Sequence, residues 1–157
     1  MTFSWTGLAL AAAILVPNAL LVLFPPREGL TALTSAGPSV VLERLGQVGC
    51  LGASVLWGED RGAAVWGGAA LLLVVAYVAL WLRYLVTGRH VLSLFEPVWG
   101  LPVPMAVLPV AAFACGALWS GSPWLAVATV VLAAGHLPNS WRTYRFLAGQ
   151  VPPSQAV

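Results

Sequence analysis

The sequence predicts an all-α fold, a polytopic membrane helix bundle of about five transmembrane helices with its N-terminus outside and its C-terminus in the cytoplasm. Of the 157 residues, 60% are hydrophobic and only 8% are charged, with a mean hydropathy of +0.90, whereas soluble domains are about one quarter charged. The apolar residues also form separate blocks. Most of these blocks approach the roughly 20 residues that cross a hydrocarbon core about 30 Å thick.

The expected helices cover residues 5–24, 40–57, 63–86, 103–119 and 124–146, and form one domain over residues 1–147. The first helix ends at Pro25-Pro26, because proline lacks an amide donor and disfavours helix for the residue before it. Ser39 is a suitable N-cap for the second helix. Residues 148–157 are expected to form a disordered cytoplasmic tail.

The chain between the third and fourth helices has a mixed character. Polar Arg89, His90 and Glu96 alternate with apolar residues over 87–101, which predicts a short helix lying in the membrane interface. Segment 103–119 is short and contains two prolines. The sequence therefore leaves open whether it crosses the membrane completely.

The arginines predict the topology, because positive residues accumulate in cytoplasmic loops. Five crossings place on one side Arg27, Arg44, Arg83, Arg89, Arg142 and Arg145. Only Arg61 falls on the other side. The C-terminus is therefore predicted to be inside, in a multi-pass protein of a cell membrane, expected to be the bacterial cytoplasmic membrane.

Strongly polar residues within the predicted helices gather in the cytoplasmic half. Ionisable groups are costly inside a bilayer and usually face a cavity or one another, so Glu43 and His136 are predicted as catalytic or acid–base residues. The predicted ligand-binding residues are Asn18, Gln47, Tyr77, Trp81, Tyr84, Glu96, Asn139 and Arg142. No metal site is predicted.

Helical spacing arranges these residues on three faces. Glu43, Gly46, Gln47, Cys50 and Ser54 lie on one face of their helix, where the glycine lets another helix approach closely. The same spacing relates His136 to Asn139, and relates Tyr77 to Trp81 and Tyr84. The hypothesis is that all three faces converge on one polar pocket that is open to the cytoplasm and closed outside.

Each candidate also has a purely structural interpretation. Glu43 could form an interhelical ion pair with Arg83, Arg89 or Arg142 that only orients the bundle. His136 could simply hydrogen-bond a neighbouring helix. No cofactor is predicted, and a haem between His90 and His136 is disfavoured because the two residues differ in depth.

The functional hypothesis is a membrane protein that binds, and as an enzyme would transform, a small lipophilic or amphipathic molecule. A transporter or channel component and an accessory subunit of a larger complex remain as alternatives. The expected partners are the lipid bilayer, the small ligand, and a homo-oligomer or a larger membrane protein. The seven scattered arginines are too thinly spread for a nucleic-acid surface.

Several short strings resemble those of a family of small, uncharacterised bacterial integral membrane proteins. The strings are Leu42-Glu43-Arg44-Leu45-Gly46-Gln47, Arg83-Tyr84 followed by Gly88-Arg89, Gly100-Leu101-Pro102-Val103-Pro104-Met105 and Gly135-His136-Leu137-Pro138. The resemblance spans residues 42–138 and implies no particular activity.

Overall fold

The computed structural model describes residues 3–28, 37–56 and 62–150. Over these ranges the chain forms α1 (Trp5–Leu23), α2 (Pro38–Leu56), α3 (Ala64–Val86), the 3-10 helix η2 (Val91–Leu94), α4 (Pro104–Ser120) and α5 (Pro123–Ala148). Over these ranges the predicted all-helical fold with five α-helices is confirmed. Arg61 and most of the predicted tail, residues 151–157, lie outside the described residues.

Three of these helices, α1, α2 and α3, are long and apolar enough to cross a membrane. α4 is apolar but has only 17 residues. α5 has 26 residues and carries several polar side chains toward its C-terminus. Three spans of this length indicate that the protein associates with a membrane.

Local sequence signals set the helix boundaries. The Ser4 hydroxyl accepts the amide N–H of Gly7 at the start of α1, and the Ser122 hydroxyl accepts that of Leu125 at the start of α5. Pro104 stands in the first turn of α4, where a missing amide donor costs little. Gly121 ends α4 with a φ of 65°, a conformation that glycine adopts without strain.

The predicted interfacial helix over 87–101 is reduced to one turn, since only Val91–Leu94 is helical there. The rest consists of turns, with an isolated bridge between Val98 and Leu101. Pro97 and Pro102 explain the difference, because neither can donate the amide hydrogen bond that a continuing helix needs.

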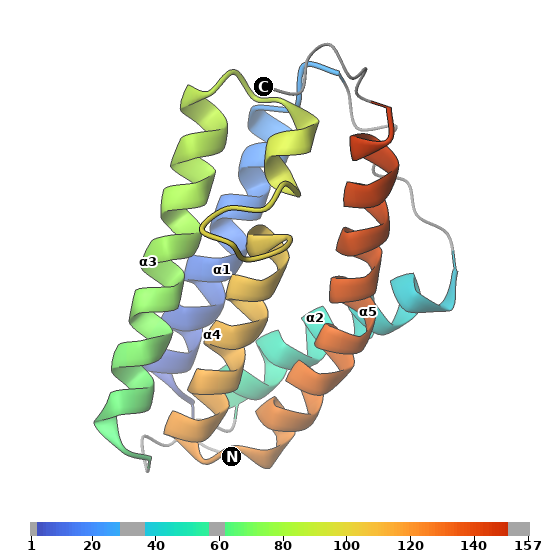
Figure 1. Ribbon diagram of the computed structural model, residues 1–157. Helices are drawn as coiled ribbons and strands as arrows, with labels where there is room; N and C mark the ends of the chain where they lie inside the picture. Colours follow the sequence, from blue (N-terminus) through green and yellow to red (C-terminus); the bar gives the residue numbers. More distant parts are fainter. Residues whose placement is uncertain (1–2, 29–36, 57–61, 151–157) are drawn as a thin grey trace.

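The helices divide into two groups (Figure 1). α1, α3 and α4 run side by side, whereas α2 crosses obliquely and packs mainly on α5. α1 meets α2 near the start of the chain, where the Ser4 amide donates to the Val55 carbonyl at 2.9 Å. α4 and α5 join the two groups.

Two apolar clusters fill the interior. One lies between α1, α2, α4 and α5, around Ile14, Cys50, Ala53, Ala112, Phe113, Ala117, Leu125 and Leu132. The other lies between α3, η2 and α4, around Tyr77, Leu80, Trp81, Tyr84, Leu94 and Leu108.

Glycines hold the α2–α5 crossing close. A Cβ added to Gly46 would overlap the backbone of Leu132, and one added to Gly135 would overlap the backbone of Glu43. The sequence-based expectation that Gly46 lets another helix approach is confirmed, and the partner is α5. This crossing brings the polar faces of α2 and α5 together around Glu43.

Candidate functional site

A carboxylate, an imidazole and an amide meet where α2 crosses α5. His136 Nδ1 lies 2.8 Å from Oε1 of Glu43, and Nδ2 of Asn139 donates to Oε2 at 2.7 Å. Both carboxylate oxygens of Glu43 therefore have partners. The structure brings together three of the predicted residues, which we call the Glu43 cluster.

The chemistry of the pair assigns the imidazole proton. An ionised carboxylate only accepts hydrogen bonds, so His136 donates through Nδ1. Nε2 of a neutral imidazole then carries a lone pair, and within the described part of the chain no hydrogen bond occupies it. A carboxylate that fixes a histidine in this way makes the opposite nitrogen a better base or ligand.

The Glu43 cluster is partly buried. The side chains of His136 and Glu43 are 24% and 21% exposed, whereas Asn139 is buried. Gln47 is half-buried one turn along α2, and Arg142 is exposed on α5. Among the described residues no ion pair joins Glu43 to Arg83, Arg89 or Arg142, which were its predicted structural partners.

The aromatic face of α3 forms a second group, together with α1. The Tyr77 hydroxyl donates to Asn18 Oδ1 at 3.0 Å, and the Tyr84 hydroxyl donates to the Phe24 carbonyl at 2.9 Å. The Trp81 ring stands edge-on between both tyrosines. These contacts hold the predicted aromatic face against α1, while η2 and α4 cover most of it.

The three predicted faces thus form two clusters instead of one. Over the described residues, α3 makes no substantial contact with α2 or with α5. The physical reason is the glycine-mediated crossing, which commits the polar face of α2 to α5. Glu96 joins neither cluster, because it pairs with Arg83 at the end of α3.

Sequence reasoning did not identify a second carboxylate–histidine pair, outside the apolar helices. Glu28 Oε1 lies 2.7 Å from His90 Nδ1, and Glu28 Oε2 accepts the Val91 amide at 3.0 Å. Burial alone would raise the pKa of the Glu28 carboxyl, but the hydrogen bonds from His90 and from the backbone outweigh it and lower the pKa below 4.5. The sequence signal for this pair was the alternation of polar and apolar residues around His90.

The fold and the site together define a class, a helical membrane-type bundle with a carboxylate–histidine–amide cluster between α2 and α5. Among the described residues, no group of three or more His, Cys, Asp or Glu side chains is placed to hold a metal ion. No protein-family model, curated protein or solved structure matches the chain.

Proposed function

We propose that the chain is a multi-pass membrane protein, N-terminus outside and C-terminus inside, that binds a small lipophilic or amphipathic molecule from the cytoplasmic side. The proposal places it in the bacterial cytoplasmic membrane. The observation that carries it is the bond between Glu43 and His136, which fixes the imidazole and leaves Nε2 available. A polar head group on the ligand is the natural partner for that nitrogen.

The cluster is suited to acid–base chemistry as well as to binding. Nε2 accepts a hydrogen bond, or a proton, from a hydroxyl or ammonium group, and the carboxylate stabilises the resulting imidazolium. Asn139 holds the second carboxylate oxygen and so keeps Glu43 in place. In this proposal His136 contacts the ligand, while Glu43 and Asn139 position it.

Access from the cytoplasmic side is supported by the exposure pattern of α1. Ala11, Ile14 and Asn18 share one helical face, yet Ala11 and Ile14 are buried whereas Asn18 is exposed. The face is therefore fully covered near the start of α1 and only partly covered around Asn18, which Tyr77 contacts. Over the described residues α1 makes no substantial contact with α5. Asn18, held by Tyr77, is proposed as the polar contact from this side.

The test measures bound lipophilic molecules in the purified protein. Wild type, Glu43→Gln and His136→Ala are extracted in a mild detergent, and native mass spectrometry compares the mass bound to each. Glu28→Gln is the matched control, because it changes the other carboxylate–histidine pair. We expect bound ligand in wild type and control and its loss from both site variants.

Equal retention of ligand by all four proteins would refute the site. The alternatives give different results. A stoichiometric protein that co-purifies with the chain would favour an accessory subunit, and solute flux in proteoliposomes without a retained ligand would favour a transporter.

A further inference from the structure

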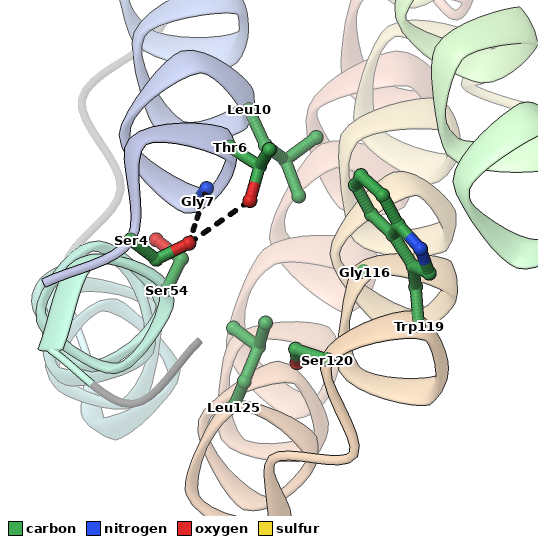
Figure 2. A pocket seen from close by; sticks show the side chains of 9 residues that line it. All are labelled: Ser4, Thr6, Gly7, Leu10, Ser54, Gly116, Trp119, Ser120 and Leu125. Atoms are coloured by element: carbon green, nitrogen blue, oxygen red, sulfur yellow. Dashed lines mark hydrogen bonds between the residues drawn. The ribbon is translucent and has the colours of Figure 1, made fainter. Parts of the chain in front are cut away.

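Two hollows of different polarity lie toward the end of the bundle where α1 and α5 begin. One is a cavity of about 20 Å³ where α1, α2, α4 and α5 meet, and the hydroxyl groups of Ser4, Ser54 and Ser120 contribute to its lining (Figure 2). The other is a groove of about 440 Å³ between α2 and α5. The cavity has room for one water molecule, whereas the groove is about twenty times larger and has an apolar lining.

The oblique crossing of α2 over α5 forms the groove. Helices that cross at an angle touch closely near the crossing point and diverge beyond it. Glycine keeps the diverging side open, because a Cβ added to Gly52 would meet nothing within 4 Å. Leu45 of α2 and Val127 of α5 line the groove as well, and both are exposed.

The groove is a site distinct from the Glu43 cluster. Successive residues of an α-helix are turned by about 100°, so Gly52 lies about 180° around α2 from Glu43. By the same rule Val131, which lines the groove, lies about 140° around α5 from His136. The groove and the cluster therefore occupy opposite sides of the α2–α5 contact.

The lining of the groove favours hydrocarbon as its content. A bound water needs two to four polar partners, and within this lining only the indole N–H of Trp124 is a polar side-chain group. An empty groove would forfeit the dispersion contacts of its walls. The exposed residues Val48 and Val130 continue the apolar surface of both helices, so a groove on a membrane-associated helix pair borders the hydrocarbon itself.

The dimensions of the groove fit a flexible chain better than a helix. Its lining extends along α5 from Trp124 to Val131 and along α2 from Leu45 to Ala53, which is a length of about 10–12 Å. Its volume then corresponds to a mean width of about 7 Å. A helix with its side chains is about 10–12 Å across, and a membrane-spanning helix is about 30 Å long.

Trp124 marks the end of the groove at which a lipid head group would lie. It stands in the first turn of α5, is 61% exposed and lines the groove. Tryptophan favours the head-group level of a membrane. The groove therefore runs from that level into the hydrocarbon, as an acyl chain does.

We infer that the groove between α2 and α5 binds an acyl chain of a membrane phospholipid, with the head group beside Trp124. In the proposed topology this lipid belongs to the outer leaflet. The inference adds a second ligand at a second site, and it does not need the Glu43 cluster to bind anything. The glycine floor and the rigid walls give the chain contacts that neighbouring lipids do not give it.

Binding of dioleoyl phosphatidylglycerol tests the site. The purified full-length protein is stripped of lipid in detergent and titrated with this phospholipid, and native mass spectrometry counts the molecules bound to each chain. Wild type should bind one molecule more tightly than all later ones. Gly52→Leu places a side chain in the open space at Gly52, and should weaken this first binding about tenfold because the side chain takes the place of part of the acyl chain.

Gly68→Leu is the matched control. A Cβ added to Gly68 also meets nothing within 4 Å, but this glycine lies on α3, which does not line the groove. Its affinity should equal that of wild type. If Gly52→Leu does not fold, Val127→Phe fills the groove from α5, and Val130→Phe is its control, because Val130 is exposed on α5 outside the lining.

Three results would overturn the inference. The first is equal affinity in wild type and Gly52→Leu, or equal weakening in Gly68→Leu. The second is a two-chain complex that forms without phospholipid and is lost in Gly52→Leu, because a second copy would then occupy the groove. The third is loss of the phospholipid from Glu43→Gln but not from Gly52→Leu. Since the phospholipid has its own mass, its retention by Glu43→Gln beside loss of the other ligand supports both sites.

Discussion

His136 Nδ1 and Glu43 Oε1 lie 2.8 Å apart, although the two residues are 93 positions apart in the chain. The bond joins two helices at a point where glycines bring the backbones together. It therefore links the site to the stability of the α2–α5 crossing.

Glu43→Gln should lower the free energy of unfolding by about 1.5–3 kcal/mol, because the substitution removes a hydrogen bond to a charged group that is three-quarters covered. Unfolding in mixed detergent micelles, followed by circular dichroism, measures the change. Glu28→Gln should cost less than about 1 kcal/mol, since that pair is half exposed. Equal effects of the two substitutions would contradict the prediction.

Gly135→Ala should destabilise the protein by about 1–3 kcal/mol, because the new methyl group would overlap the backbone of Glu43 and force α2 away from α5. Gly52→Ala is the control within α2, since a Cβ there meets nothing within 4 Å. It should gain about 0.5–1 kcal/mol from helix propensity. Melting temperatures in micelles distinguish the two, and a tolerated Gly135→Ala would argue against this crossing.

Stability should depend on pH through Glu28. Its folded-state pKa is lowered below 4.5, so the carboxylate binds protons less readily in the folded state than in the unfolded state. The contribution is then fully present above the unfolded pKa and is lost as the pH falls through the folded pKa. The melting temperature of wild type should therefore drop below about pH 4.5 more steeply than that of Glu28→Gln. Parallel pH profiles would show that the pair contributes nothing.

Cysteine labelling tests the proposed topology. Phe3→Cys and Gln150→Cys place exposed thiols before α1 and after α5. With the N-terminus outside and the C-terminus inside, an impermeant maleimide should label Phe3→Cys in intact cells and Gln150→Cys only after permeabilisation. Wild type measures the background from the two native cysteines. Labelling of both variants in intact cells would mean an even number of crossings.

The sequence by itself determined the helical character of the chain and the approximate position of each helix. Long apolar blocks and prolines at their ends act locally, so they can be read without knowing the partners of a helix. The predicted N-cap Ser39 was wrong, because α2 already begins at Pro38. The same local rules identified Glu43, His136 and Asn139 as unusual, because charged and amide groups are costly in an apolar helix.

Only the tertiary structure decided which of these residues meet. Helical spacing places Tyr77, Trp81 and Tyr84 on one face of α3 but does not say which helix covers it, and the structure packs it mainly against η2 and α4, with α1 residues at its edge. The crossing angle of α2 depends on the backbone contacts at Gly46 and Gly135, which periodicity cannot show. That crossing separated the predicted single pocket into the Glu43 cluster and the aromatic face of α3, and it placed the Cys50 thiol of α2 against Thr129 of α5.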